Sequence, residues 1–315
     1  MECLLAKTLQ DGSALCVLRF VFPGETSYPE WLPGVFEDDA PADWSGYYRD
    51  VFSGASADEI TDVVYVATVD GAPASKMWFG YSRRSRIGNF GNVVTRPEFR
   101  RRGLMSENLK LCVADFLASP ALSISCDAAA TAAPVYHAAG FEWLFGEKHH
   151  PMAMVKLETG SFSRLLEQAY GNADGAVVRV GRRGDRFDCD KLLAYAPCVY
   201  LGGERRTLLS PWIPDYLNAF QHVQAHRASL AVVESRAGFC AGYAWTAECA
   251  PGRNVLDFVV HASFAAYAPA LFEMACAGLS GTVLAFPDRT RRADRESLKR
   301  AGFHELACNI YEKRL

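Results

Sequence analysis

The chain has 315 residues, half of them apolar and 22% charged, and its formal net charge is −3. That length suits two domains of ordinary size, each with a sizeable core. The near-neutral charge argues against bulk attraction to nucleic acid or to an anionic membrane. Neither an apolar leader nor an apolar run of about 18 residues is seen, so we expect a soluble, cytoplasmic protein.

The ten cysteines are scattered within apolar stretches such as residues 14–18, and no Cys-x-x-Cys pair occurs. This pattern predicts free thiols in the core of a protein from a reducing compartment, and no metal site. His149 and His150 follow a predicted strand and precede Pro151. They could contribute to a metal site, but a solvated loop is the favoured interpretation.

Strands and helices alternate along the first half of the chain. Asp70-Gly71 between two β-branched, apolar runs predicts a hairpin, and Pro41 suits the first turn of a helix. The expected elements, in chain order, are a strand near residues 2–7, helices over 12–21 and 41–54, strands over 63–69, 74–82 and 87–95, a helix from 105, a strand over 121–126, a helix over 131–139 and a strand pair over 141–157.

Residues 93–105 lead from an apolar strand through a turn rich in Arg and Gly into an amphipathic helix. A helix start presents unpaired backbone N–H groups and partial positive charge. Gly103 allows close approach to the backbone, and Arg100, Arg101 and Arg102 add fixed positive charge. The turn therefore suits a phosphate or pyrophosphate, the alternative being an Arg-rich surface turn without a ligand.

Two motifs in this region resemble signatures of the GNAT superfamily of acyl-CoA N-acyltransferases. Thr95–Arg100 reads Thr-Arg-Pro-Glu-Phe-Arg, and the Arg-x-x-Gly-x spacing continues to Met105, where the family has a small residue. Val135–Phe141 resembles the family's Leu-Tyr-x-x-x-Gly-Phe, although Ala129 replaces an Asn that often precedes it. The expected order of strands and helices is also the family's order.

The resemblance implies acetyl-CoA as acyl donor, no metal, and Tyr136 as the acid that protonates the CoA thiolate. The alternative for Tyr136 is a packing residue. The general base stays unassigned because Asn89 and Asn92 accept protons poorly, and family members often use ordered water. The residues expected to bind the donor, from the strand into the helix, are Val93, Val94, Thr95, Arg100, Arg101, Arg102, Gly103, Leu104, Met105 and Ser106.

The acceptor is expected to be an amine on a small molecule. Glu37, Asp38, Asp39 and Asp43 lie where the resembling family roofs its acceptor site. They could attract a cationic amine, or they could be an ordinary solvated loop, which is slightly favoured. Asp38, Asp39 and Asn92 are the candidate substrate-binding residues.

The second half repeats features of the first. Ala139-Gly140-Phe141 recurs as Ala301-Gly302-Phe303, and Gly238 stands before Trp245 as Gly71 stands before Trp78. We therefore expect an α/β (α+β) protein with two GNAT-like domains, 1–157 and 158–315, each a mixed, mostly antiparallel twisted sheet flanked by helices. Two unrelated α/β halves are the alternative.

The second domain is expected to be degenerate, because residues 262–267 stand in place of the phosphate turn and lack Gly and Arg, and Leu298 stands in place of Tyr136. The predicted function is that of an N-acetyltransferase acting on small-molecule amines. The alternatives are a non-catalytic acyl-CoA-binding or regulatory protein and a protein N-acyltransferase. The arginines of residues 83–102 suit one polyphosphate better than a nucleic acid, and a monomer or homodimer is expected.

Overall fold

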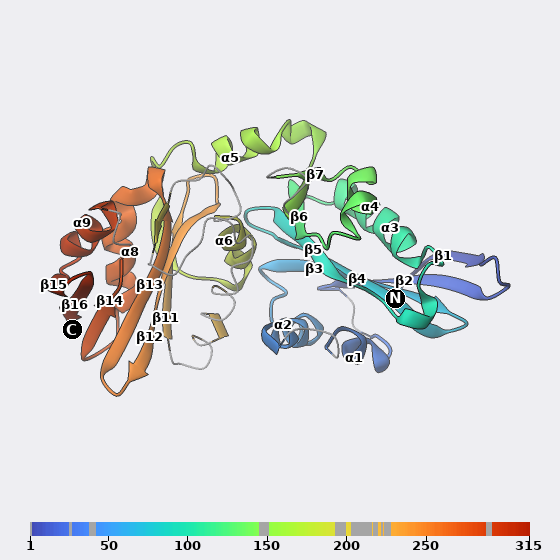
Figure 1. The fold of residues 1–315 in the computed structure, drawn as a ribbon, viewed down its shortest axis with the longest axis horizontal. Coiled ribbons are helices and arrows are strands. Elements are labelled where there is room, and N and C mark those ends of the chain that lie inside the picture. Colours follow the sequence, from blue (N-terminus) through green and yellow to red (C-terminus); the bar gives the residue numbers. More distant parts are fainter. Residues whose placement is uncertain are drawn as a thin grey trace. The chain divides into compact units, whose positions relative to one another are not determined.

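The computed structural model describes residues 2–24, 27–37, 42–144, 151–192, 200–202, 216, 220–221, 223, 228–287 and 292–315. The chain divides into two compact units, Met1–Glu158 and Thr159–Leu315. Each unit has its own mixed, mostly antiparallel sheet flanked by helices, which confirms the expected fold class (Figure 1).

The strands of the first unit are ordered β1-β2-β3-β4-β5-β6-β8-β7, and every neighbouring pair is antiparallel except β5–β6. Its elements are β1 (Glu2–Thr8), β2 (Ala14–Phe22), α1 (Trp31–Glu37), α2 (Ala42–Ser53), β3 (Ile60–Val69), β4 (Ala72–Ser82), β5 (Ile87–Thr95), a 3-10 turn (Pro97–Phe99), α3 (Leu104–Ala118), β6 (Ser123–Asp127), α4 (Ala133–Ala138), β7 (Glu142–Trp143) and β8 (Pro151–Val155).

The helix predicted over residues 12–21 is wrong, since these residues belong mainly to strand β2. Apolar residues there include β-branched and aromatic side chains, which suit a pleated surface, and Leu15, Val17 and Phe20 are buried. β2 also pairs along both edges, with β1 and with β3. These tertiary pairings decide the conformation of a segment whose apolar composition fits either structure.

A helix does precede α2, but it is α1 (Trp31–Glu37), which was not predicted. Pro33 and Gly34 are poor residues for a helix interior, and they masked the signal. Pro33, however, lies in the first turn, where its missing N–H costs nothing. Leu32 and Phe36, four residues apart, form the buried face.

Helices cover both faces of the first sheet: α1 and α2 lie on one side, and α3 and α4 on the other (Figure 1). Consecutive residues of β4 show this division, because their side chains point to opposite faces. Trp78 packs against Tyr47 of α2, with ring centroids 5.4 Å apart, whereas Phe79 packs against Phe116 of α3 at 6.1 Å.

A buried carboxylate joins α2 to the sheet. Asp62 Oδ1 accepts hydrogen bonds from the Tyr47 hydroxyl (2.5 Å) and from Trp78 Nε1 (2.7 Å). We expect Asp62→Ala to lower the free energy of unfolding by roughly 2–4 kcal/mol, because both buried donors lose this acceptor. Urea denaturation measures the loss, with Asp58→Ala as control because Asp58 is an exposed carboxylate four residues earlier. A loss no larger than that of the control would contradict the role of Asp62.

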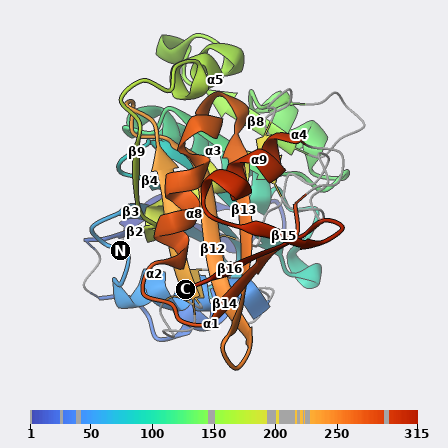
Figure 2. The same cartoon turned by 90° about the vertical axis from the view of Figure 1, so that its left-hand side faces the viewer.

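The strands of the second unit are ordered β15-β16-β14-β13-β12-β11-β9, and β10 pairs additionally with β13. Figure 2 shows α8 and α9 on one face of this sheet. The elements are a 3-10 turn (Leu157–Thr159) at the boundary, α5 (Phe162–Tyr170), β9 (Val177–Val180), a 3-10 turn (Arg183–Asp185), α6 (Arg186–Leu192), β10 (Tyr200–Gly202), β11 (Ala228–Glu234), β12 (Cys240–Ala250), β13 (Arg253–His261), a 3-10 segment (Ala262–Tyr267), α8 (Ala268–Cys276), β14 (Thr282–Ala285), α9 (Arg292–Arg300), β15 (His304–Ala307) and β16 (Ile310–Arg314).

Seven strands of each sheet match in order, and β1 and β10 have no counterpart among the described strands. The order β2-β3-β4-β5-β6-β8-β7 corresponds to β9-β11-β12-β13-β14-β16-β15, and the parallel pair is β5–β6 in one sheet and β13–β14 in the other. The Ala-Gly-Phe turns match as well: Phe141 N donates to Tyr136 O, and Phe303 N donates to Leu298 O. This correspondence is what a tandem repeat predicts.

Candidate functional site

The strands β5 and β6 separate soon after they begin to pair. Their parallel ladder joins Ile87–Asn89 to Ser123–Ser125, although β6 continues to Asp127 and β5 to Thr95. Within the described part of the first unit, no strand pairs with this edge of β5 beyond Asn89. An unpaired strand edge can bind an extended amide-containing chain through main-chain hydrogen bonds.

A β-bulge lies in the unpaired part of β5. Trp78 of β4 pairs with Gly91 and Lys76 pairs with Val94, so two residues of β5 face one residue of β4. One of the two, Asn92, has a positive φ of 49°. Its Nδ2 donates to Phe36 O of α1 at 3.4 Å. A bulge of this kind turns backbone groups away from the regular ladder, as is common next to functional sites.

The turn between β5 and α3 has the geometry of an anion cradle. Arg101 and Gly103 both adopt positive φ, 62° and 79°, and α3 begins directly afterwards. A Cβ placed on Gly103 would meet no atom within 4 Å, so the space next to the α-carbon of Gly103 is open. Left-handed turn residues followed by a helix N-terminus direct several N–H groups toward one point, where an anion is stabilised.

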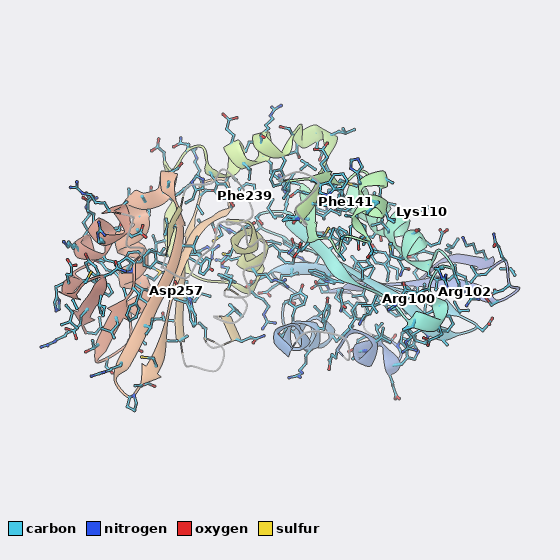
Figure 3. The ribbon with its side chains drawn as sticks, viewed as in Figure 1. Arg100, Arg102, Lys110, Phe141, Phe239 and Asp257 are labelled. Carbon is cyan, nitrogen blue, oxygen red and sulfur yellow. The ribbon has the colours of Figure 1, made fainter. Side chains whose placement is uncertain are left out.

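The three arginines of the turn occupy different environments, and Figure 3 labels two of them, Arg100 and Arg102. Arg100 Nε donates to Thr95 O at 3.0 Å, and Arg101 is exposed. Arg102 is held by the β1–β2 turn, where its guanidinium pairs with Asp11 and donates to Ser13 Oγ at 2.7 Å. Hydrogen bonds from Ser13, and then the charge of Arg102, lower the pKa of Asp11. The Arg102 charge is thus fixed beside the cradle.

The other predicted donor-binding residues lie along one path from β5 into α3. Val93 packs against the core on the α3 side, Thr95 Oγ1 lies 2.9 Å from Ser75 Oγ, and Leu104 is buried beneath the turn. Val94 lines a pocket on the α1 side, whereas Met105 and Ser106 are half-buried in the first turn of α3. Asp38, Asp39 and the His149-His150 pair lie outside the described residues, as does the side chain of Asp43.

Tyr136 packs over the middle of β5. Its ring centroid lies 4.9 Å from that of Phe90, which is on β5, and 6.1 Å from that of Phe141. The side chain is 4% exposed, and its hydroxyl forms no hydrogen bond with another described residue. Burial, with Cys126 and Cys112 nearby, raises the pKa of Tyr136 above its ordinary value. The phenol is therefore protonated at neutral pH.

A pocket of about 360 Å³ lies between α1 and the β4–β5 pair. The sequence did not indicate the part of it formed by Gly34 and Val35, because α1 was not predicted. The available signal was the spacing of Leu32 and Phe36 on one helical face. The described residues that line the pocket are Gly34, Val35, Pro73, Ala74, Ser75, Lys76, Val94, Arg96, Pro97 and Arg100.

The corresponding edge in the second unit is filled by the chain itself. β13 pairs with β14 over Arg253–Leu256, and further along β10 pairs with Val259–His261. The helix after β13 has Tyr267 at its N-cap with φ −89°, where α3 has the left-handed Gly103. Both features of the first unit, the unpaired edge and the open turn, are thus replaced.

We expect one molecule of acetyl-CoA per chain, because β10 covers the edge that a second molecule would need. Isothermal titration calorimetry of the full chain measures this stoichiometry. A substitution at the first site, Gly103→Glu, should weaken this binding at least about tenfold. Two equivalent sites, or a signal that survives this substitution at full amplitude, would contradict the expectation.

Two further findings concern metals and membranes. Among the described residues, no three His, Cys, Asp or Glu side chains are grouped as a metal ion would require. No helix in the described ranges is both long and apolar enough to cross a bilayer. The cysteines within those ranges are free thiols, and Cys198 lies outside them.

No protein-family model and no curated protein matches the chain. Several solved structures are similar to it at low identity. A ribosomal-protein-S5-alanine acetyltransferase from Vibrio fischeri is 11% identical, and the match covers 45% of this chain and 93% of that chain with a TM-score of 0.35. A GNAT superfamily phosphinothricin acetyltransferase from Sinorhizobium meliloti, in complex with acetyl-CoA, is 11% identical over 44% of this chain and 88% of that chain, with a TM-score of 0.34.

AAC(6′)-Ib in complex with paromomycin and acetyl-CoA is 16% identical, and the match covers 45% of this chain and 94% of that chain with a TM-score of 0.34. These three solved structures are acetyltransferases, and each likeness spans less than half of this chain.

Proposed function

We propose that the first unit transfers an acetyl group from acetyl-CoA to an amine of a small molecule. The observation that carries this proposal is the continuity of the unpaired β5 edge with the open turn at Gly103. The edge offers backbone partners to the amides of a pantetheine arm, and the turn offers N–H groups to a pyrophosphate. Acetyl-CoA carries the amides and the pyrophosphate along one chain, and it therefore matches this arrangement.

The transfer proceeds by direct attack. The neutral amine adds its lone pair to the thioester carbonyl carbon, and a tetrahedral oxyanion forms. Backbone N–H groups near the bulge at Asn92 would stabilise that oxyanion, since a β-bulge leaves a residue of the strand unpaired. Collapse of the intermediate breaks the carbon–sulfur bond and releases the thiolate, and the amine nitrogen loses its extra proton to water.

Tyr136 donates the proton that the departing thiolate takes up, and the phenolate then regains a proton from solvent water. Burial raises the pKa of its phenol, so the proton is in place at neutral pH. The same burial destabilises a thiolate anion close by, so the pKa values of the phenol and of the thiol are raised together. The Tyr136 hydroxyl forms no hydrogen bond with another described residue, so none of these residues competes with the thiolate for it.

A thiol-release assay with acetyl-CoA and a panel of small amines tests the proposal, with isothermal titration of acetyl-CoA run beside it. Binding together with amine-dependent release of CoA thiol is the expected result. Binding without release for any amine or peptide would favour a non-catalytic acyl-CoA-binding or regulatory protein. Release with peptides but not with small amines would favour a protein N-acyltransferase.

A further inference from the structure

We propose that Cys189 and Cys240 are a site of oxidative modification in the second unit, at which a peroxide joins the two thiols in an intramolecular disulfide. Cys189 lies on α6, and Cys240 is the first residue of β12. Their Sγ atoms are 3.1 Å apart. That distance exceeds the length of a covalent S–S bond by only about 1 Å, so closing the bond needs a small displacement of the two sulfurs.

The contacts around the two thiols hold α6 against the start of β12. The backbone N–H of Cys240 donates to Asp188 Oδ2 at 3.0 Å, and Asp188 is the residue before Cys189. Cys240 Sγ also lies 3.3 Å from Gly242 O. Asp188, Cys189 and Cys240 are at most 1% exposed. The proximity of the two sulfurs is thus set by tertiary contacts rather than by the rotation of exposed side chains.

Burial determines which oxidant can act on the two thiols. It raises the pKa of both, so little thiolate is present at neutral pH and the reaction is expected to be slow. Because neither side chain is exposed, the oxidant must also be small. Hydrogen peroxide meets this requirement.

The oxidation has two steps. One thiolate attacks a peroxide oxygen, the O–O bond breaks, and a sulfenic acid and a hydroxide ion form. The second sulfur then attacks the sulfenic sulfur, the S–S bond forms, and another hydroxide ion leaves. The two thiol protons neutralise the two hydroxide ions. Two thiols and one hydrogen peroxide therefore yield one disulfide and two water molecules.

The disulfide would tie together the two ends of the segment that supplies β10. Cys189 and Cys240 are 51 positions apart, and β10 lies between them. β10 pairs with Val259–His261 of β13, along the edge whose counterpart in the first unit is open. A cross-link that closes a long loop stabilises a fold chiefly by restricting the unfolded chain. Oxidation should therefore stabilise the second unit with this edge covered.

The test treats the folded full chain with hydrogen peroxide, blocks the remaining thiols by alkylation, and maps the tryptic peptides without reduction. The expected product is a cross-link between Phe187–Lys191 and Ala237–Arg253, the peptides that contain Cys189 and Cys240. Cys240→Ala should abolish this cross-link. Cys249→Ala should retain it and is the matched control, because Cys249 lies in the same peptide and the same strand but is exposed.

Thermal denaturation measures the consequence of the cross-link. Oxidised wild type and oxidised Cys249→Ala should melt at least about 5 °C above their reduced forms. Cys240→Ala should show no such rise, and its treated form reports any effect of peroxide on other residues. Cys189→Ala provides the same comparison if circular dichroism shows that reduced Cys240→Ala is not folded.

Absence of the cross-link in folded, peroxide-treated wild type would overturn the proposal. So would a preference of Cys189 for another cysteine, such as Cys198, because the fold would then not select this pair. A complete cross-link without a rise in melting temperature would overturn its stabilising role.

Discussion

Tyr136→Phe should lower kcat by roughly 10²-fold or more, the usual scale for a group that transfers a proton in the transition state. The substitution keeps the ring and its contact with Phe90, so the affinity for acetyl-CoA and the melting temperature should barely change. Steady-state thiol release measures kcat, and calorimetry measures acetyl-CoA affinity in the same preparation.

The pH dependence gives an independent check on Tyr136. Burial raises its pKa, so the wild-type kcat should not fall through loss of this proton below about pH 10, the ordinary value for a phenol. Tyr48→Phe is a suitable control, since Tyr48 is a buried tyrosine that packs against Trp78 on the opposite face of the sheet. Normal turnover in Tyr136→Phe would assign Tyr136 to packing alone.

Gly103→Glu should weaken acetyl-CoA binding at least tenfold, about 1.4 kcal/mol. Two effects contribute. The carboxylate would lie at the helix N-terminus and compete with the pyrophosphate for the same N–H groups. In addition, Gly103 has φ of 79°, and an L-residue in that conformation costs roughly 1–2 kcal/mol, which would shift the turn.

Gly278→Glu is the matched control for this substitution. Gly278 also has φ of 79°, and a Cβ built on it meets no atom within 4 Å, but it lies in the second unit. Gly103→Ala separates the backbone strain from the added charge. Both variants should retain more affinity for acetyl-CoA than Gly103→Glu does. If Gly103→Glu binds normally while folded, the cradle is not the pyrophosphate site.

Local sequence signals determined much of the first unit. The helix α3 follows from its apolar spacing, the β3–β4 hairpin from Asp70-Gly71, and the open turn from Gly103 among arginines. These are features in which neighbouring residues suffice: a periodic apolar face, a turn residue that tolerates positive φ, and a helix start. The resemblance of residues 95–105 and 135–141 to family signatures added the expected positions of donor and acid.

Tertiary structure decided the rest. Residues 14–22 form a strand because β1 and β3 bond to both edges, and α1 forms around Pro33 because Leu32 and Phe36 are buried. Both outcomes depend on partners far away in sequence, which local composition does not specify.

The same reason applies to the functional features that sequence analysis missed. Among the described residues, the edge of β5 beyond Asn89 is unpaired because its ladder with β6 ends at Ser125, and the pocket forms because Gly34 and Val35 of α1 lie against the β4–β5 pair. In the second unit, β10 pairs with the corresponding edge of β13. Which strand edge is left open is a property of the whole sheet, since it depends on the path of every neighbouring strand.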